Sequence, residues 1–381
     1  MTKGLIATAA AGLAAAAVVA TAVAKTSAPA GASQVAQCTN VSLGMLAPLT
    51  GPAAFLGQEQ LSWVRFAVSK FNRQYGTRFK VVLADTQLSA SLARTAGRRL
   101  NANPNVMAVI GGSTSQSVIS TAGLFKRTGL VSISGSATRV DLTNGQFPTF
   151  FRVVPHDGIQ APNIVAFLTK RLRVDNVVVI DSQDDYSVPL AQAIARGLRR
   201  AGVEVSRESV AADETDFSSI VANVSGAADI VVFATQTASA AQTLSQQLRE
   251  QGKRAVVFGT DGAYSPTQFK PRLGYVSSFA NDLRFLPSAR PLVREYNRFS
   301  RNKPFGTFGP PSYMAAWVAM TAIRAACADG RATRPEVTEQ VRRTNVPSIL
   351  GGRIQFTRNG DVRGAKFYIF RVTDGQYRLV G

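Results

Sequence analysis

Residues 106–117 read VMAVIGGSTSQS, a short apolar run that ends in two glycines and a series of hydroxyl side chains. The apolar run is typical of a β-strand buried on both faces, and the segment after it opens a helix that extends to Lys126. A buried strand followed directly by a helix is the repeating unit of a parallel α/β sheet. This stretch therefore predicts the fold class, and the sequence on either side continues the same pattern.

Short apolar strands alternate with helices on both sides of Pro155. The first series has strands at 41–46, 79–84, 106–110 and 130–133, with helices at 61–75, 89–100 and up to Lys126. After Pro155 the pattern restarts, with strands at 176–181, 203–210, 229–233 and 255–259 and helices at 186–200, 216–225 and 238–251. Two such series predict two doubly wound α/β lobes with parallel sheets. Helices and short strands return after residue 288, so we expect the chain to cross between the lobes more than once. Lobes joined in this way close on a ligand by hinging.

The first forty residues are expected to be an export leader. Lys3 precedes an alanine-rich apolar run from Leu5 to Ala24, and two A-x-A sites at 28–32 would allow cleavage. We therefore expect a signal peptide at 1–32 and a location in the periplasm or at the outer face of the cytoplasmic membrane. An uncleaved anchor and lipidation of Cys38 are the alternatives.

Export permits disulfides, and the chain has two cysteines. Cys38 lies just before the first strand, and Cys327 ends an apolar helix. Helices in a parallel α/β layer run antiparallel to the strands, so the end of a helix lies near the start of a strand. We therefore predict a disulfide between Cys38 and Cys327.

The composition excludes several kinds of site. The chain has 381 residues with one histidine and two cysteines. These cannot build a metal site with several histidines or a four-cysteine zinc or iron–sulfur site, so neither a metal nor another cofactor is expected. A histidine-based triad would have to use His156, and the loop at 111–117 lacks the spacing of a phosphate loop or a nucleophile elbow. We therefore predict a binding protein and not an enzyme.

The net charge of +20 leaves an anionic partner open. From residue 283 to the C-terminus there are 17 basic and 6 acidic residues, so the excess is greatest there. It can reflect the overall arginine-rich composition, or it can form a docking face for an anionic surface. Nucleic acid is not an expected partner, because the basic residues occur in pairs and not in a stripe with interleaved aromatics.

Five polar or turn-forming loops follow expected strands, which is where open α/β sheets bind ligands. They are 48–57, 111–117, 134–138, 184–186 and 259–262. Hydroxyl and backbone N–H groups around Ser115 suit an anion at a helix start, and the carboxylate of Asp261 suits an ammonium group. Each loop alone could be a simple cap or turn. Together they predict a zwitterionic ligand whose nonpolar side chain points toward Leu56.

In order and spacing these segments resemble the extracytoplasmic solute-binding proteins of the leucine/isoleucine/valine-binding family, which have the type I periplasmic-binding fold. The resemblance extends from about Val41 to the C-terminus. It rests on LAPLTGP at 46–52, VIGG at 109–112 with Ser115, Ile133-Ser134 leading to Ala137-Thr138, FRVVPHD at 151–157 with Gln160, Tyr186, DFS at 216–218, and Tyr313.

The resemblance implies two lobes joined by three crossovers, made of residues 38–154 plus 283–346 and residues 155–282 plus 347–381. It also implies a monomeric protein that delivers a small molecule to the membrane permease and ATPase of an ABC importer. A ligand-sensing ectodomain of the same fold is the alternative function. The disulfide positions of the family are not matched by the two cysteines of this chain.

The resemblance further implies a role for individual residues. Ser115 and Thr138 would bind the ligand carboxylate, the backbone carbonyl of Ser136 would face its ammonium group, and Asp261 corresponds to the acid of the amine site. The implied ligand-binding set is Leu56, Ser115, Ser136, Ala137, Thr138, Tyr186, Gln236 and Asp261. With Ser115, Thr138 and Asp261 in these roles, a neutral aliphatic amino acid is expected. Gln236 replaces a tyrosine of the family and could suit a polar or larger ligand, so an amide, urea or an aromatic acid is the alternative.

Overall fold

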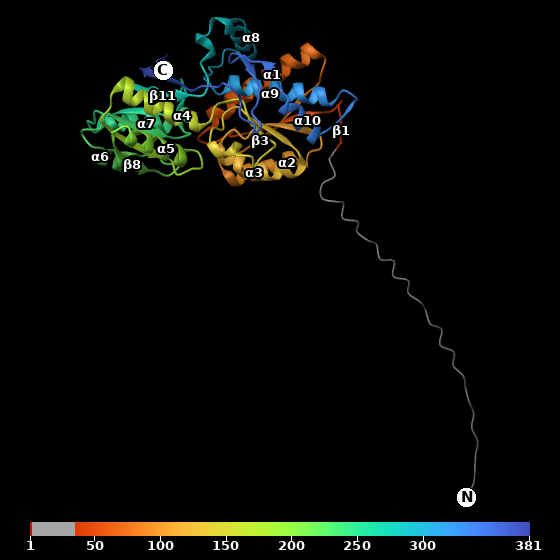
Figure 1. Ribbon diagram of the computed structural model, residues 1–381, viewed down its shortest axis with the longest axis horizontal. Coiled ribbons are helices and arrows are strands. Elements are labelled where there is room, and N and C mark those ends of the chain that lie inside the picture. Colours follow the sequence, from red (N-terminus) through yellow and green to blue (C-terminus); the bar gives the residue numbers. More distant parts are fainter. Residues whose placement is uncertain (2–34) are drawn as a thin grey trace. The chain divides into compact units, whose positions relative to one another are not determined.

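Two β-sheets, each with five parallel strands in the same order, organise the chain (Figure 1). The computed structural model describes Met1 and residues 35–381, so the expected signal peptide at 1–32 lies outside the described residues. The strand order is β3-β2-β4-β5-β6 in the first sheet and begins β8-β7-β9-β10-β11 in the second. This is a doubly wound order, so the predicted fold class of two parallel α/β lobes is confirmed.

The first sheet is buried on both faces. Its strands are β2 (Ser42–Ala47), β3 (Lys80–Asp85), β4 (Val106–Gly111), β5 (Val131–Ser134) and β6 (Phe150–Arg152). One face packs on α1 (Ala54–Tyr75), α9 (Gly309–Ala326) and α10 (Arg334–Arg342), and the other on α2 (Ala90–Ala102) and α3 (Ser115–Thr128). Leu43 and Met45 belong to the core under α1 and α9, whereas Leu46 belongs to the core under α2 and α3. The two faces alternate in this way because successive side chains of a strand point to opposite sides of the sheet.

The second sheet carries two additional antiparallel strands at one edge. Its strands are β7 (Asn176–Asp181), β8 (Glu204–Ser209), β9 (Ile230–Ala234), β10 (Val256–Gly259), β11 (Gly274–Ser278), β15 (Tyr368–Thr373) and β16 (Gln376–Leu379). Its helices are α4 (Asp157–Ala166), continued by η2 (Phe167–Leu172), α5 (Ser187–Arg200), α6 (Ser218–Asn223) and α7 (Ala238–Glu250). Val177 and Val179 pack with α4 and α5, and Val178 and Ile180 pack with α6 and α7. Helices therefore cover both faces of this sheet as well.

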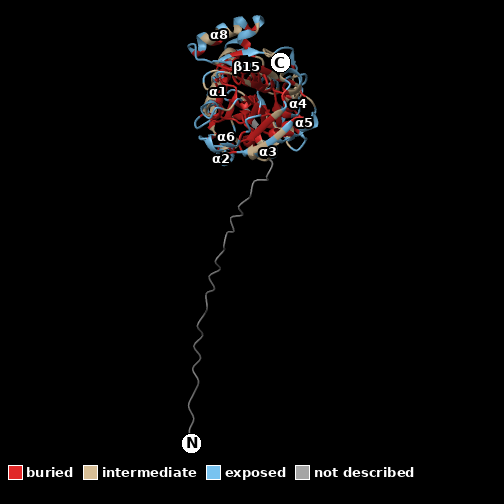
Figure 2. Ribbon diagram, turned by 90° about the vertical axis from the view of Figure 1, so that its left-hand side faces the viewer, coloured by how far each residue is buried: buried red, intermediate tan, exposed pale blue. Residues whose placement is uncertain are grey.

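The chain passes between the two sheets three times, as expected. It leaves the first sheet after β6, returns after β11, and leaves again after β14 (Arg353–Ile354) to form β15 and β16. The remaining elements are β1 (Val35–Gln37), β12 (Arg331–Thr333), β13 (Val346–Pro347), α8 (Arg290–Ser300), η1 (Val140–Thr143), η3 (Asp261–Ala263), η4 (Leu283–Phe285) and η5 (Pro287–Ala289). Buried residues fill the interior of this unit, while α8 projects from it and is largely exposed (Figure 2).

Helix α1 begins earlier than the sequence suggested. Two prolines and two glycines at 48–57 indicated a loop up to residue 57, but the helix starts at Ala54 and includes Gly57. A Cβ atom at Gly57 would lie 2.0 Å from the carbonyl oxygen of Pro48. Glycine is therefore required here for close approach of the helix to the preceding loop, and not for a turn.

The predicted disulfide between Cys38 and Cys327 is present. Cys38 follows β1, which pairs with β12, and Cys327 directly follows α9. The cross-link joins residues 289 positions apart. It therefore restricts most of the unfolded chain.

Replacing both cysteines by serine should lower the free energy of unfolding by about 2–5 kcal/mol, because a native cross-link restricts the unfolded chain. Urea unfolding of the exported protein and of the double variant measures the difference. Wild-type protein unfolded under reducing conditions is the control and should match the variant. Two free thiols in the unreduced wild-type protein would contradict the prediction.

Candidate functional site

The loops predicted to bind a ligand lie at the carboxyl ends of both parallel sheets. In each sheet the strand order reverses, between β2 and β4 in the first and between β7 and β9 in the second. Ser115 follows β4 and Gln236 follows β9, so these two residues lie at the reversals. Thr138 and Asp261 follow the next strands, β5 and β10. Open α/β sheets bind ligands at such reversals.

Ser115 is the first residue of α3, and its hydroxyl is available. The residue is 1% exposed, and its Oγ has no hydrogen-bond partner among the described residues. The neighbouring hydroxyls of Thr114 and Ser117 bond to each other at 2.7 Å. A helix start also offers unbonded N–H groups and the positive end of the helix dipole. Ser115 is therefore a buried donor placed to receive an anion.

The backbone before α3 lies close to β2. Gly111 has φ +121°, and a Cβ atom there would lie 2.2 Å from the carbonyl oxygen of Leu46. The N–H of Ser113 donates to the same carbonyl oxygen at 3.2 Å. Only glycine permits this approach, which holds the start of α3 beside the end of β2.

The side chain of Ser136 has a structural role. Its hydroxyl donates to the carbonyl oxygen of Ser113 at 2.6 Å and accepts from the Nε2 of Gln60 at 2.7 Å. Ser134 fixes the same loop, because its hydroxyl accepts from the N–H of Ala137 at 2.9 Å. These bonds join the loops after β4 and β5. They leave only the backbone carbonyl of Ser136 for a ligand, which is the group that the family resemblance implied.

Thr138 presents a second available hydroxyl. It is 1% exposed, and its Oγ1 has no hydrogen-bond partner in the described part of the chain. Its carbonyl oxygen accepts from the N–H of Asp157 at 2.8 Å, which brings the start of α4 against this loop. Ala137 beside it is also buried.

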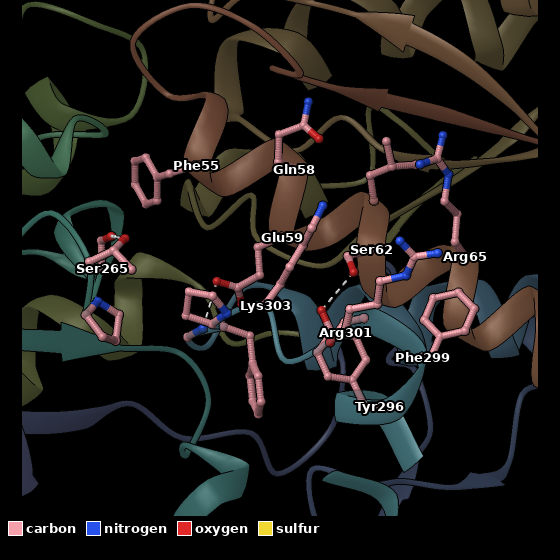
Figure 3. A pocket seen from close by; sticks show the side chains of 17 residues that line it. Phe55, Gln58, Glu59, Ser62, Arg65, Ser265, Tyr296, Phe299, Arg301 and Lys303 are labelled. Carbon is pink, nitrogen blue, oxygen red and sulfur yellow. Dashed lines mark hydrogen bonds between the residues drawn. The ribbon is translucent and has the colours of Figure 1, made fainter. Parts of the chain in front are cut away.

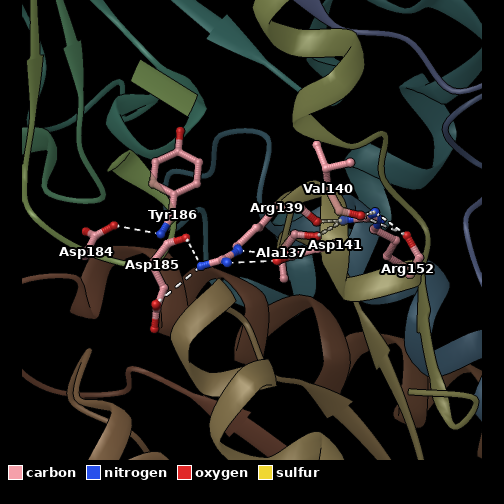
Figure 4. Close-up of polar contacts among 9 residues, drawn as sticks. Ala137, Arg139, Val140, Asp141, Arg152, Asp184, Asp185 and Tyr186 are labelled. Atoms are coloured by element: carbon pink, nitrogen blue, oxygen red, sulfur yellow. Dashed lines mark hydrogen bonds and ion pairs between the residues drawn. The ribbon is translucent and has the colours of Figure 1, made fainter. Parts of the chain in front are cut away.

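Arg152 holds the loop that carries Ala137 and Thr138 (Figure 4). The fully buried guanidinium donates to the carbonyl oxygens of Ala137 at 3.3 Å and Arg139 at 2.6 Å. It also donates to Thr143 Oγ1 at 2.6 Å and to Asp361 Oδ1 at 2.7 Å. Burial lowers the pKa of Arg152, and the charge of Asp361 opposes that shift. The guanidinium is therefore committed to positioning the loop and not to binding a ligand.

Two buried carboxylates, Asp157 and Asp261, lie on the other side of the site. Asp261 accepts from the hydroxyl of Tyr186 at 2.7 Å, and burial raises its pKa to about 6. Burial and the negative charge of Asp261 raise the pKa of Asp157 well above its ordinary value. The nearby hydroxyl of Thr138 lowers the pKa of Asp157, yet neither oxygen of Asp157 has a hydrogen bond of normal geometry in the described residues. Two such carboxylates attract a cation.

Tyr186 comes into the site from the start of α5. Its hydroxyl lies 2.7 Å from Thr260 Oγ1 and 2.7 Å from Asp261 Oδ1. Burial raises the pKa of Tyr186, so its hydroxyl keeps its proton and donates. The structure therefore brings Tyr186 and Asp261 together as expected from the sequence.

Asp157 and Gln160 were not assigned a role from the sequence. Both belong to the segment at 151–160 that carries the family resemblance, and no function followed from that. In the structure Gln160 donates through Nε2 to Ser277 at 2.8 Å, and its Oε1 has no partner in the described chain. The sequence offered one indication that they act together. They are three positions apart, which places them on the same side of helix α4.

Four of the residues with unpaired buried atoms belong to the loops and helix starts of this site, and their atoms are of two kinds. Ser115 and Thr138 offer hydroxyl donors, whereas Asp157 and Gln160 offer acceptor oxygens. Buried polar groups are nearly always hydrogen-bonded, so unpaired groups that converge on one place indicate a missing partner. A molecule with a carboxylate at one end and an ammonium group beside it would satisfy both kinds. The described arrangement is therefore suited to a zwitterion.

Two sets of contacts connect the lobes at the edge of this site. Gln236 donates through Nε2 to Gln116 Oε1 at 3.2 Å and to Asp184 at 3.3 Å. Arg139 donates to the carbonyl oxygen of Asp185 at 3.0 Å (Figure 4). A hollow of about 730 Å³ lies beside these residues. The contacts hold the lobes together in the present arrangement.

Leu56 lies on the first turn of α1 and is 2% exposed. It belongs to a cluster that includes Phe308 and, from the second lobe, Tyr264 and Phe279. Leu56 therefore contributes apolar surface where the two lobes meet.

A separate cavity of about 560 Å³ lies between α1, α8 and the loop 301–306 (Figure 3). It is lined by none of the predicted site residues. Its one carboxylate, Glu59, accepts from the N–H groups of Gly306 at 2.8 Å and Gly309 at 2.7 Å. Burial raises the pKa of Glu59 to about 7. Glu59 therefore fixes the loop before α9 and is not part of the interlobe site.

Within residues 35–381 no group of three or more His, Cys, Asp or Glu side chains could hold a metal ion. The helices of that same range are all too short or too polar to span a bilayer.

Comparisons with known proteins agree with this geometry. A family model described as "Periplasmic binding protein" matches residues 40–376. Leu/Ile/Val-binding protein homolog 3 of Brucella melitensis is 26% identical over 352 residues, which cover 90% of this chain and 93% of the relative.

Solved structures show the same fold. The branched-chain amino acid transporter substrate binding protein of Streptococcus pneumoniae, in complex with isoleucine, has a TM-score of 0.78 at 20% identity, covering 90% of this chain and 99% of that one. A fatty acid ABC transporter substrate-binding protein from Thermomonospora curvata has a TM-score of 0.76 at 20% identity, covering 90% and 91%. The fold is thus shared by proteins described with different ligands.

Replacing Arg152 by Met should lower the free energy of unfolding by about 3–5 kcal/mol, because Asp361 loses its partner and the buried carbonyls lose their donor. Urea unfolding measures the change. Arg358→Met removes a nearby exposed arginine that makes no ion pair, so it is the matched control and should change stability by less than about 0.5 kcal/mol. Equal effects of the two substitutions would contradict the role of Arg152.

Proposed function

Since the chain belongs to the periplasmic binding protein family, we propose that it is the substrate-binding component of an ABC importer and that its ligand is a neutral aliphatic amino acid. It is a binding protein and not an enzyme. The observation that carries the proposal is the set of unpaired buried atoms, with hydroxyl donors at Ser115 and Thr138 and acceptor oxygens at Asp157 and Gln160.

In the proposed complex, the ligand carboxylate accepts hydrogen bonds from Ser115, Thr138 and the N–H groups at the start of α3. The ammonium group lies between Asp157 and Asp261 and donates to the backbone carbonyl of Ser136. The side chain extends toward Leu56 and Ala137. Apart from the carboxylates, no charged group in this set remains for the side chain, which supports a neutral ligand.

The complex would be stabilised by lobe closure. We keep the expected lobe boundaries, 38–154 plus 283–346 and 155–282 plus 347–381. Ser115 and Thr138 come from the first lobe and Asp261 from the second, so a zwitterion contacts both lobes only when they are closed. A ligand that binds the closed state better shifts the population toward it. The closed protein would then deliver the ligand to a membrane permease.

Export is part of the proposal. Periplasmic binding proteins act outside the cytoplasm, and the disulfide between Cys38 and Cys327 suits an oxidising compartment. The apolar run at 5–24 would direct export, either as a cleaved signal peptide or as an anchor.

The ligand class can be tested by calorimetry with leucine and three matched analogues. Of these, 4-methylpentanoate lacks the amine, 3-methylbutylamine lacks the carboxylate, and leucinamide replaces the carboxylate by an amide. Leucine should bind at least tenfold more tightly than each analogue, because a buried charged group left without its partner costs more than about 1.4 kcal/mol. If 4-methylpentanoate binds as tightly as leucine, the assignment of an amine site is wrong. A simple carboxylate would then be the favoured ligand, as the description of the fatty acid transporter protein suggests.

Ser115→Ala identifies the carboxylate end in the same experiment. The substitution should weaken the binding of leucine by about 1–3 kcal/mol and leave the binding of 3-methylbutylamine unchanged, because only leucine has a carboxylate. Ser120→Ala is the control, because Ser120 lies on the same helix and its hydroxyl donates to the carbonyl oxygen of Gln116 at 2.6 Å. An unchanged leucine affinity in Ser115→Ala would place the carboxylate elsewhere.

Affinity for leucine should fall as the pH is lowered through about 6. Burial raises the pKa of Asp261 to about 6 and raises that of Asp157. Protonation removes the negative charges that hold the ammonium group, while leucine stays zwitterionic between about pH 5 and pH 8. Calorimetry over this range measures the change, and Asp261→Asn should bind more weakly with a shallower pH dependence.

The other titratable groups near the carboxylates do not reverse this sign. Tyr186 stays protonated because burial raises its pKa, and Arg139 and Arg152 stay charged. Burial and the charge of Arg152 lower the pKa of His156, which favours its neutral form, and its protonation at low pH would repel the ammonium group and so act in the same direction. Burial raises the pKa of Asp184, so its protonation acts in the same direction. Tighter binding at pH 5 than at pH 8 would contradict the assignment.

A further inference from the structure

Seven basic side chains on one side of the molecule have no partner. Arg290, Arg294, Arg298, Arg301 and Lys303 lie on α8 and the loop after it, and Arg371 and Arg378 lie on the β15–β16 hairpin. All seven are exposed. None of them has a carboxylate oxygen within 4.0 Å or donates a hydrogen bond in the described part of the chain. We call this set, with the apolar side chains described below, the basic face.

The arginines of α8 are arranged along the helix. Arg290, Arg294 and Arg298 are spaced by four residues, so they form a row on one side of α8. The buried side of the helix carries Tyr296 and Ser300. The row therefore points away from the core, and nothing in the described chain neutralises it.

The hairpin presents the same charge. Arg371 and Arg378 are directly opposite each other in the antiparallel pair. Like charges in this position repel each other and destabilise a hairpin. The hairpin is also the outer edge of its sheet, so no further strand covers it. An anion between the two guanidinium groups would relieve the repulsion.

Helix α8 and the hairpin lie at the same end of the molecule. Both views place α8 and the C-terminus at this end, and the second also places β15 there (Figures 1 and 2). Phe285, which is in η4 beside α8, lines a hollow of about 990 Å³ together with Arg371 and Arg378. Phe285 therefore links the cations of the hairpin to the segment that leads into α8.

Exposed apolar side chains lie on, or next to, the elements that carry these cations. Phe285 is 52% exposed, Phe299 is 41% exposed and Leu379 is 43% exposed. Phe285 and Phe299 are the only exposed phenylalanines in the described part of the chain. Phe299 lies at the border with α1, where its ring centroid is 5.4 Å from that of Phe66 (Figure 3). Aromatic rings exposed to water are unfavourable, so a group of them marks a surface that another molecule or a lipid layer covers.

We propose that the basic face binds the anionic phospholipid surface of the membrane beside which this protein works. Arginines on long side chains suit many phosphate groups without a fixed pattern, and each adds to the attraction near an anionic bilayer. The dispersed phenylalanines suit the headgroup boundary of a lipid layer, where aromatic rings are favoured. A protein partner would instead be matched by a continuous apolar groove and paired charges. The cations of the basic face have no carboxylate partners in the described chain, and its two exposed phenylalanines line different hollows.

The proposal is independent of the ligand of the interlobe site, since none of the seven cations lies in that site. It assigns a function to the charge excess after residue 283. Attachment would concentrate the protein at the membrane and restrict its orientation, with α8 and the β15–β16 hairpin toward the lipid.

Vesicle sedimentation tests the proposal. The exported protein, with whichever N-terminus it then has, is mixed with vesicles of phosphatidylcholine alone or with about one third phosphatidylglycerol. We expect binding to the anionic vesicles at low salt, at least a tenfold loss at about 0.5 M salt, and little binding to neutral vesicles. Binding that is insensitive to salt and to lipid charge would assign membrane attachment to the N-terminal apolar run and overturn the proposal.

Charge-matched variants separate the face from the net charge. Replacing Arg290, Arg294 and Arg298 by serine should reduce binding to the anionic vesicles at least tenfold. The control replaces the three exposed arginines 94, 98 and 99 of α2, which lies at the opposite end of the molecule in both views. This control variant has the same net charge as the α8 variant, but it should bind the anionic vesicles nearly as well as the wild type.

Three further outcomes would overturn the proposal. An equal loss in both triple variants would show attraction by net charge without a defined face. No vesicle binding by the wild type at low salt would exclude the lipid surface. Binding to heparin that is lost in the α8 variant, with vesicle binding unchanged, would identify a soluble polyanion as the partner. Leucine calorimetry on the same variants should be unchanged, which separates this surface from the proposed function.

Discussion

The guanidinium of Arg152 is the interaction on which the interlobe site depends. Arg152 ends the last strand of the first sheet, at the first crossover, and it binds Asp361 from the third crossover. The N–H of Arg152 also donates to the carbonyl oxygen of Gly360 at 3.0 Å. The same side chain holds the loop that carries Thr138. One buried cation thus joins two crossovers to a loop of the site.

A buried guanidinium is stable only when its donors are all matched, because removing it from water costs several kcal/mol. Carbonyl oxygens from 137–140, the hydroxyl of Thr143 and the carboxylate of Asp361 provide these acceptors. This requirement fixes the loop in a single conformation. In contrast, the side-chain oxygens of Ser115, Thr138 and Asp157 have no hydrogen-bond partner among the described residues. The structure therefore satisfies its own polar groups where it positions the site and leaves them open where a ligand would bind.

The sequence predicted the fold well, because buried strands between amphipathic helices have a clear period. The strands at 106–110 and 229–233 lie within one or two residues of β4 and β9, and the disulfide followed from the direction of helices in such a layer. The predicted start of α1 was wrong because glycine is typical of turns. In the folded chain, Gly57 instead allows the helix to lie close to the backbone of Pro48. Of the two strands added to the second sheet, β15 was expected as a short segment but not placed, and β16 was not expected, since pairing depends on distant residues.

Within the site, local sequence indicated Ser115, Thr138, Tyr186 and Asp261, because each follows a strand end. It assigned no role to Asp157, whose importance depends on the charge of Asp261 more than 100 positions away. It also could not show that the Ser136 hydroxyl is occupied by Gln60 and Ser113. Both follow from burial. Away from water, a nearby charge or an unpaired oxygen has a much larger effect on the free energy than it has at the surface.

The sequence by itself determined the doubly wound fold, the loops that would form a site, the absence of residues for metal or histidine chemistry, and the excess of positive charge after residue 283. Only the tertiary structure decided which hydroxyls are free, that two carboxylates share one buried region, and that the unpaired arginines gather at one end. The physical reason is that periodicity and composition are properties of neighbouring residues. Desolvation, charge coupling and a common surface arise only when segments far apart in the chain are brought together.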